Sequence, residues 1–237
     1  MGVYVDELYE LLSEEILAGM CFECEDEKAD KVNKHTEIAK ELAARFIEEL
    51  PEMRRKLVAD VNATYINDPA ARNVGEVIFC YPGIRAITNY RMANKLLRLE
   101  VPLIPRYIAE MAHSETGIDI HPRARIGENF TIDHGTGVVI GSTSIIGNNV
   151  KIYQGVTLGA KSFPVDEEGK PIKGIPRHPI VEDDVVIYSG ATILGRITIG
   201  KGSVIGGNVW VTRNISPNSR IIQNRPKEHS FSYGAGI

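Results

Sequence analysis

A six-residue periodicity runs through the C-terminal half of the chain and restricts its fold more than any other feature. From Ile118 onward, units made of a small or apolar residue, any residue and an apolar residue recur every six positions, often followed by glycine. Such a repeat is the sequence signature of a β-helix. The clearest units are Ala124-x-Ile126-Gly127, Val138-x-Ile140-Gly141, Ser144-x-Ile146-Gly147, Val150-x-Ile152, Val156-x-Leu158-Gly159, Val185-x-Ile187, Ala191-x-Ile193, Ile197-x-Ile199-Gly200, Ser203-x-Ile205-Gly206 and Val209-x-Val211.

Each unit is expected to form one short strand whose second apolar side chain fills the interior of the solenoid. The small residue two places earlier fits near a corner, and the glycine permits the turn. Three units make one triangular coil, and successive coils stack at about 4.8 Å. Unrelated strands of a β-sandwich would not keep one register through so many units. The period does not determine the hand of the coil.

The first half of the chain has a helical pattern instead. Apolar residues recur at helical spacing, and several segments open on a proline, which is favoured at the first helical position. Gly19 stands where it would end the first helix. The expected helices are Asp6–Ala18, Asp30–Leu50, Pro51–Tyr65, Pro82–Leu99 and Pro102–Glu115.

The expected fold class is therefore α+β, with an N-terminal α-helical domain followed by a parallel β-helix. The helical domain covers residues 1–117 and the β-helix residues 118–222, with an excursion loop near 160–178. A flexible tail, residues 223–237, follows. No glycine-rich linker separates the two domains, so they should pack directly on one another.

Composition excludes several classes of protein. The net charge of −4 and the lack of a basic block argue against nucleic acid as a partner. No stretch approaches about eighteen consecutive apolar residues, so no membrane span is expected. Asp6, Glu7 and Glu10 stand where a signal peptide would carry Lys or Arg, which favours a cytoplasmic location.

The three cysteines do not predict a disulfide framework. Cys21 and Cys24 have the CxxC spacing of half a zinc site or of a redox pair. A second CxxC is absent, Cys80 is distant in sequence, and no βαβ pattern surrounds the pair. We therefore expect ordinary reduced thiols.

The repeat is interrupted twice, and both interruptions carry polar groups. Eight residues rather than six separate Ile132 from Ile140, so two extra residues fall within 133–137. The second interruption is the excursion from about Ala160 to His178. A pattern that is regular elsewhere often departs from its rule at a functional site.

His134, inside the first interruption, is a candidate general base, because an imidazole can take a proton from an attacking hydroxyl near neutral pH. Asp119 lies fifteen residues earlier, close to one coil of eighteen, and could sit beside it on the adjacent coil. The alternative is that His134 only caps a turn in a glycine-rich loop. Spacing alone does not decide between the two.

Several motifs resemble the serine acetyltransferase signature, within the hexapeptide-repeat acyltransferase superfamily. The resemblance runs from about residue 60 to the C-terminus, and it implies a left-handed β-helix. The motifs that carry it are Asp68-Pro69-Ala70, Asp119-Ile120-His121-Pro122, Ile132-Asp133-His134-Gly135-Thr136-Gly137, Val150–Gly159, Arg177-His178-Pro179, Ala191-Thr192-Ile193-Leu194-Gly195 and Tyr233–Ile237.

The resemblance implies transfer of an acetyl group from acetyl-CoA to L-serine, the first step of cysteine biosynthesis. It makes His134 the catalytic base and Asp119 the carboxylate that orients it. Carboxylates can pair with the serine ammonium, and a guanidinium fork suits its carboxylate. The residues implied to hold the amino acid are Asp68, Asp133, Arg177 and His178.

Further expectations follow from the same resemblance. Acetyl-CoA is the co-substrate and no metal is needed, with L-cysteine a feedback inhibitor in the serine pocket. The assembly is a homotrimer, and a dimer of trimers stays open because the helical half is short at its start. Backbone groups lining the pantetheine channel fall at Gly159, Ser189, Gly190 and Gly207.

The chain also departs from the family pattern. Ser142 stands where many relatives carry glutamate after the glycine at Gly141, so an auxiliary role of that glutamate is in doubt. The excursion is longer than in many relatives. Its lysines, Lys161, Lys170 and Lys173, reach coenzyme A phosphates in one interpretation and form a solvated loop in the other.

The tail Ser232–Ile237 lies beyond the repeat and ends on an apolar side chain beside a carboxylate. The resemblance implies that Ile237 enters the active site of O-acetylserine sulfhydrylase, since a pocket for an amino-acid carboxylate can capture a chain terminus. A tail without a partner is the alternative, because Ala235 replaces the acidic residue common there.

Three other functions are compatible with a β-helix. The first is an acetyltransferase acting on a sugar or antibiotic hydroxyl, which would lack Asp68-Pro69 and the spacing of the two histidine motifs. The second is a γ-type carbonic anhydrase, with zinc on His121, His134 and His178. The third is a scaffold without catalysis, which the Asp119 and His134 pair argues against.

Overall fold

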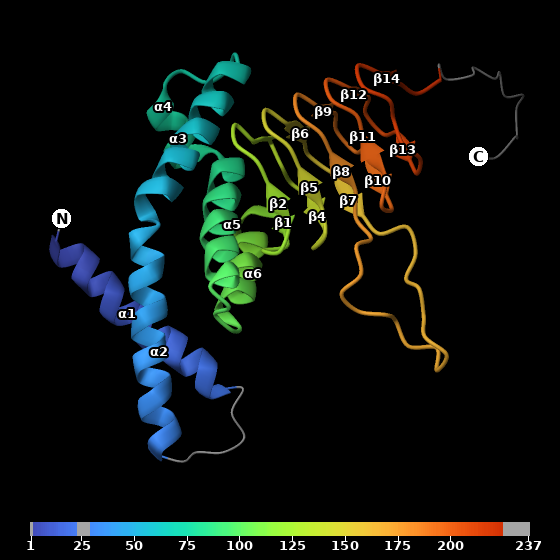
Figure 1. Ribbon diagram of the computed structural model, residues 1–237. Helices are drawn as coiled ribbons and strands as arrows, with labels where there is room; N and C mark the ends of the chain where they lie inside the picture. The colour runs from blue at the N-terminus through green and yellow to red at the C-terminus, as the bar shows by residue number, and fades with distance from the viewer. Residues whose placement is uncertain (1, 23–28, 225–237) are drawn as a thin grey trace, which may run out of the picture.

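The computed structural model describes residues 2–22 and 29–224, with side chains described from residue 33 in the second range. A bundle of helices stands at one end of a long solenoid of short strands (Figure 1). The helices are α1 Gly2–Phe22, α2 Ala29–Glu48, α3 Leu50–Asn67, α4 Val74–Cys80, α5 Pro82–Arg98 and α6 Ile104–Thr116.

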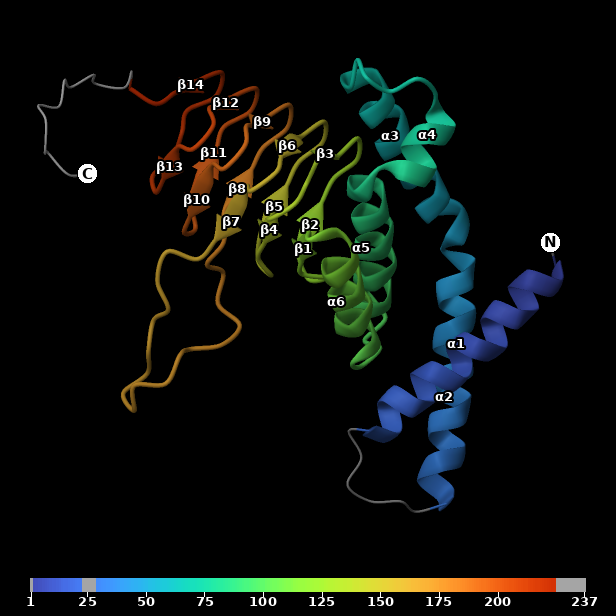
Figure 2. The ribbon, with the colours of Figure 1, turned by 180° about the vertical axis from the view of Figure 1, so that it is seen from behind.

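The helices form two groups. α1 and α2 cross each other on the side away from the solenoid in both views (Figures 1 and 2). α3, α5 and α6 contact the first strands of the solenoid, as the packing of α3 and α5 on β3 and of α6 on β1 shows. This second group connects the helical domain to the solenoid.

Two details of the helical half differ from the sequence prediction. Gly19 does not end the first helix: it is buried inside α1, where a Cβ would lie 3.2 Å from the carbonyl oxygen of Pro102. The glycine therefore permits a close approach of two segments. In the sequence, a glycine with this role cannot be distinguished from one that ends a helix. α4 was not expected; it is capped by Asn73, whose side chain accepts a hydrogen bond of 2.9 Å from Glu76 N.

The solenoid consists of parallel strands in three sheets, which confirms the predicted hexapeptide β-helix. We name the sheets A (β1-β4-β7-β10-β13), B (β2-β5-β8-β11) and C (β3-β6-β9-β12-β14). The strands are β1 Asp119–Ile120, β2 Arg125–Ile126, β3 Thr131–Asp133, β4 Val139–Ile140, β5 Ile145–Ile146, β6 Lys151–Tyr153, β7 Thr157–Gly159, β8 Ile180–Val181, β9 Val186–Ile187, β10 Thr192–Leu194, β11 Thr198–Ile199, β12 Val204–Ile205, β13 Trp210–Val211 and β14 Arg220–Ile221.

The second apolar residue of each unit fills the interior, as the repeat predicted. In sheet A, the stacked residues Ile120, Ile140, Leu158, Ile193 and Val211 are all at most 4% exposed. Their neighbours along each strand face outward. The repeat therefore assigns a side to every strand residue, including those near the candidate site.

A buried ion pair joins the helices to the first coil. Arg91 on α5 donates to both carboxylate oxygens of Asp60 on α3, at 2.6 and 2.8 Å. Arg91 also donates to the carbonyl of Gly127 at 2.8 Å, and the Phe130 N–H donates to Asp60 at 3.0 Å. Both side chains are almost fully buried. This arrangement fixes α3, whose C-terminal end carries Asp68, against the solenoid.

The excursion loop leaves the solenoid between β7 and β8. The paired residues Thr157 and Thr192 are 35 positions apart (192 − 157), whereas Val139 and Thr157 are 18 apart (157 − 139). The extra chain projects away from the coils in both views (Figures 1 and 2). No helix among the described residues is both long enough and apolar enough to cross a membrane.

Candidate active site

Two edges of the triangular solenoid carry the candidate residues. We call the turns from sheet C to sheet A, residues 134–138, 154–156, 188–191 and 206–209, the His134 corner. The turns from sheet A to sheet B, residues 121–124, 141–144, 160–179 and 195–197, are the Arg177 corner. The strands of sheet A separate the two corners.

The two extra residues of the first interruption form a wide turn at the His134 corner. His134 has φ 56°, and Gly135 and Gly137 also have positive φ, which allows the chain to bulge outward. Backbone hydrogen bonds from Gly137 N to Gly117 O and from Gly155 N to Thr136 O, at 2.8 and 2.9 Å, fix the turn. The His134 side chain is 75% exposed. The backbone of the turn is therefore held by hydrogen bonds to both neighbouring coils, while its imidazole is exposed.

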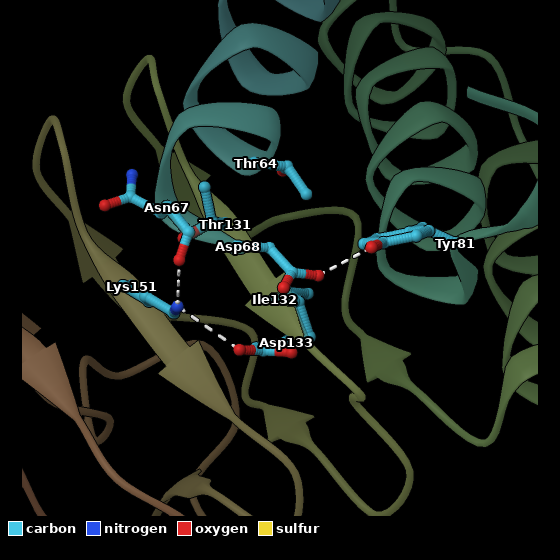
Figure 3. A pocket seen from close by; sticks show the side chains of 8 residues that line it. All are labelled: Thr64, Asn67, Asp68, Tyr81, Thr131, Ile132, Asp133 and Lys151. Atoms are coloured by element: carbon cyan, nitrogen blue, oxygen red, sulfur yellow. Dashed lines mark hydrogen bonds and ion pairs between the residues drawn. The ribbon is translucent and has the colours of Figure 1, made fainter. Parts of the chain in front are cut away.

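Beside this turn, a small pocket contains two carboxylates (Figure 3). Asp68, just after α3, accepts hydrogen bonds from the Tyr81 hydroxyl at 2.6 Å and from Ala70 N at 2.8 Å. These bonds lower the pKa of Asp68, and the same contact with Asp68 raises the pKa of Tyr81 to about 12. Asp68 is therefore an oriented carboxylate, which suits binding of an ammonium group.

The second carboxylate, Asp133, lies between two nitrogen groups. Lys151 Nζ is 3.2 Å from Asp133 Oδ2, and His134 Nε2 is 3.8 Å from Asp133 Oδ1. Lys151 also donates to the carbonyl of Asn67 at 3.1 Å (Figure 3). The structure thus brings Asp68, Asp133 and His134 together in one chain.

Asp119 lies next to the same corner on the preceding coil. Its backbone N–H donates to Val138 O at 2.9 Å, and it pairs with Val139 across β1 and β4. Its neighbour Ile120 is buried, so the Asp119 side chain is on the outer side. Within the described residues, no hydrogen bond or ion pair joins Asp119 to His134. Its role as the orienting carboxylate stays a prediction.

Arg177 and His178 lie at the Arg177 corner. The Nδ1 atom of His178 accepts from Thr143 N at 3.1 Å, so a neutral ring carries its proton on Nε2. Burial, together with Arg177 and Arg196, lowers the pKa of His178 to about 4. The Nε atom of Arg177 is buried without a hydrogen-bond partner in the structure.

His121, one of the three histidines considered for zinc, is at the Arg177 corner as well. Its Nδ1 atom accepts from Arg123 N at 3.0 Å, which again places the proton of the neutral ring on Nε2. Burial, followed by Arg106 and Arg123, lowers the pKa of His121 to about 4. Arg177 and two neutral imidazoles that can donate through Nε2 are a donor set for a carboxylate.

One chain therefore holds the predicted amino-acid ligands in two places. Asp68 and Asp133 are beside His134, whereas Arg177 and His178 are on the other side of sheet A. The sequence analysis expected all four around one amino acid, and a single copy of the chain does not bring them together.

Glycines stack on successive coils along the His134 corner. A Cβ at Gly137 would lie 3.6 Å from the Cα of Gly155, and one at Gly155 would lie 3.4 Å from Gly190. Gly207 lies on the same corner, close to the carbonyl of Ser189. Three of the four residues predicted to line the pantetheine channel, Ser189, Gly190 and Gly207, thus share the His134 corner. Gly159 ends β7 at the Arg177 corner.

The sequence analysis missed the two side chains that contact the carboxylates of the pocket, Tyr81 and Lys151. Tyr81 gives no local signal, because only the fold brings it to Asp68. Lys151 could have been found from the pairing of the strands. It pairs with Thr131 across β3 and β6, so it lies one coil from Asp133 and on the same outer face. The residue between the two apolar positions of each unit points outward in this way.

Several predictions about other sites concern residues at or beyond the limits of the structure. Cys21 and Cys80 are exposed free thiols, while Cys24 lies outside the described residues. Ile237 and the rest of the tail also lie outside them. Within residues 2–22 and 29–224, no three His, Cys, Asp or Glu side chains are grouped as metal ligands.

Comparison with known proteins gives a consistent result. The family profile "Bacterial transferase hexapeptide (six repeats)" matches residues 178–213. The chain is 60% identical to "Serine acetyltransferase, plasmid" of Synechococcus elongatus, over 84% of this chain and 62% of that protein. It is 45% identical to the serine acetyltransferase of Bacillus licheniformis, over 71% of this chain and 74% of that protein. The chain thus spans about three fifths of the first relative and three quarters of the second.

A solved structure is similar over nearly the whole chain. The crystal structure of serine acetyltransferase isoform 3 from Entamoeba histolytica, in complex with cysteine, superposes with a TM-score of 0.80 at 35% identity. The match covers 96% of this chain and 74% of that one. Both the helical bundle and the β-helix are therefore common to the two proteins.

Proposed function

The chain belongs to the serine acetyltransferase family, and from that premise we propose that it transfers the acetyl group of acetyl-CoA to the hydroxyl of L-serine. The products are O-acetyl-L-serine and coenzyme A. The observation that carries the proposal is the position of His134, in the two-residue insertion of the repeat: its Nε2 atom is 3.8 Å from Asp133, and it interacts electrostatically with Asp68.

In the proposed reaction, His134 removes the proton of the serine hydroxyl as its oxygen attacks the thioester carbon. The acetyl C–S bond then breaks, and the thiolate of coenzyme A takes up a proton. Asp68 and Asp133 hold the serine ammonium, and Asp119 orients the imidazole. We place the extended pantetheine arm along this corner, where Gly137, Gly155 and Gly190 stack on successive coils and project no side chains.

We propose that the active site is completed by a second copy of the chain in a homotrimer. The support is the separation of Arg177 and His178 from His134 within one chain, together with the exposure of the His134 ring. In a cyclic trimer, the Arg177 corner of one copy can face the His134 corner of the next. The neighbour then supplies the ligands of the serine carboxylate and excludes water from the base.

Mixed trimers test this assembly. His134→Ala and Arg177→Ala should each be nearly inactive alone. When the two variants are co-expressed, about a quarter of the sites would have both residues intact, and activity should return to that degree. Failure of mixed trimers to regain any activity would place both residues in the same chain's site.

We also propose that L-cysteine competes with L-serine, because it carries the same ammonium and carboxylate groups. A cysteine complex of the Entamoeba histolytica relative supports this.

We further propose that Ile237, at the end of the tail, docks into O-acetylserine sulfhydrylase. Deleting Ile237 should abolish co-elution with that enzyme and leave acetyl transfer intact. Equal binding by the truncated and full chains would show that the tail is not the anchor.

A thiol-release assay with an acceptor panel tests the activity. Acetyl-CoA is supplied with L-serine, homoserine or simple sugars, and free thiol is measured. L-serine should give the fastest release. Release that depends on a sugar and does not respond to L-serine would favour the alternative, a hexapeptide acetyltransferase for sugars or antibiotics.

A further inference from the structure

The pocket in which we place the substrate ammonium already contains a cation, the side chain of Lys151. Its side chain is only 16% exposed, and Nζ contacts both Asp133 Oδ2, at 3.2 Å, and Asn67 O, at 3.1 Å (Figure 3). Nζ also lies 4.7 Å from the centroid of the Tyr153 ring. Burial alone would lower the pKa of Lys151, but interactions with Tyr153 and Asp133 outweigh it and raise that pKa. The ammonium is therefore a permanent part of the pocket.

The carboxylate of Asp133 is shared between Lys151 and His134, and the sharing is unequal. Its Oδ2 atom is within ion-pair distance of Nζ, while Oδ1 is 3.8 Å from His134 Nε2. The latter separation is too long for a hydrogen bond. A carboxylate that closed this gap would bind the proton on Nε2, and that nitrogen could no longer accept the serine proton.

We propose that Lys151 is a positioning residue that holds Asp133 away from His134 Nε2 and so keeps this nitrogen open to the substrate hydroxyl. The inference rests on the proposed function, in which His134 is the base. Through the carbonyl of Asn67, the same ammonium fixes the end of α3 next to Asp68. One side chain thereby links Asp133 to the end of α3 that precedes Asp68.

Replacement of Lys151 by methionine tests this role. The variant keeps the length and the apolar stem of the side chain but loses its charge. A small displacement of a catalytic group costs up to about 100-fold, so we expect kcat to fall about 10- to 100-fold with the KM for acetyl-CoA unchanged. Lys151→Gln, which keeps a hydrogen-bond donor for Asn67 O, should show the same loss of kcat with a smaller loss of stability.

A double-mutant cycle shows whether Lys151 acts through Asp133. In the Asp133→Asn background, Lys151→Met should change kcat by less than about twofold, because the carboxylate to be held is absent. A merely structural role would give the same fold loss in both backgrounds. Lys201→Met is the matched control, since Lys201 pairs with the exposed Asp184 at 3.4 Å on the outer surface; it should leave kcat unchanged.

The outcomes separate the two proposals. A wild-type protein that releases no thiol with L-serine contradicts the proposed function itself. An active wild type whose Lys151→Met and Lys151→Gln variants both keep more than about half of kcat overturns only the role of Lys151. Additive losses in the cycle overturn it as well.

Discussion

The buried ion pair between Arg91 on α5 and Asp60 on α3, both of which also hydrogen-bond to the backbone of the first coil, should be the most sensitive link between the helical domain and the solenoid. Arg91→Met removes the guanidinium and leaves the Asp60 carboxylate, which is 0% exposed, without its countercharge. Breaking a buried pair in this way costs about 3–5 kcal/mol. For a chain of this size each kcal/mol lowers Tm by about 2–4 °C, so we expect a loss of about 6–20 °C.

The effect should depend on pH in a defined direction. Burial raises the pKa of Asp60, and Arg91 and the Phe130 N–H oppose that shift. A carboxyl whose pKa is higher in the folded than in the unfolded state contributes stability in its protonated form, and this contribution is lost as pH rises through the folded pKa. Removing Arg91 raises the folded pKa further. The deficit of Arg91→Met should therefore be smaller at pH 5 than at pH 8.

Thermal unfolding followed by circular dichroism at both pH values measures this. Arg55→Met is the matched control, because Arg55 also links α3 to the first coil, through Glu128 at 2.9 Å, but is exposed. It should lower Tm far less. The double variant Asp60→Asn/Arg91→Met should recover part of the loss, because no buried charge remains. A deficit of less than about 1 kcal/mol, equal at both pH values, would refute the reasoning.

Two further predictions concern catalysis. His134→Ala should lower kcat by about 100- to 10,000-fold with little change in the KM for acetyl-CoA, and Asp119→Ala should lower kcat less because Asp119 only orients the ring. Steady-state kinetics measures both effects. If His134→Ala keeps more than about a third of the wild-type kcat, the base is elsewhere. Gly141→Ala should raise the KM for L-serine about tenfold, because its Cβ would overlap the His178 ring and displace a ligand of the serine carboxylate; an unchanged KM would show that His178 does not bind serine.

The repeat made the solenoid predictable because its period is tied to geometry. Ile152 had to face the interior, so Lys151 and Tyr153 had to face outward. The boundaries of the helices were less predictable, because the sequence does not distinguish a glycine that ends a helix from one, such as Gly19, that permits close packing. Only the fold shows that the carbonyl of Pro102 lies against it.

The candidate site could be located from the sequence where the repeat itself was broken. The insertion at 133–137 located His134, and counting coils located Asp119 beside that turn. The contact of Lys151 with Asn67 spans 84 positions and depends on how α3 packs on the solenoid, which no local pattern specifies. The separation of Arg177 from His134 does follow from strand order, since the excursion leaves sheet A and the insertion leaves sheet C.

Identification of the product tests the central claim most directly. The protein is incubated with L-serine and acetyl-CoA labelled with carbon-13 in the acetyl group, and the products are analysed by mass spectrometry and NMR at a mildly acidic pH. We predict one labelled acetyl ester on the serine hydroxyl for each thiol released by the wild type, and none above background with His134→Ala. Thiol release without labelled O-acetyl-L-serine, or equal ester formation by both proteins, would contradict the account.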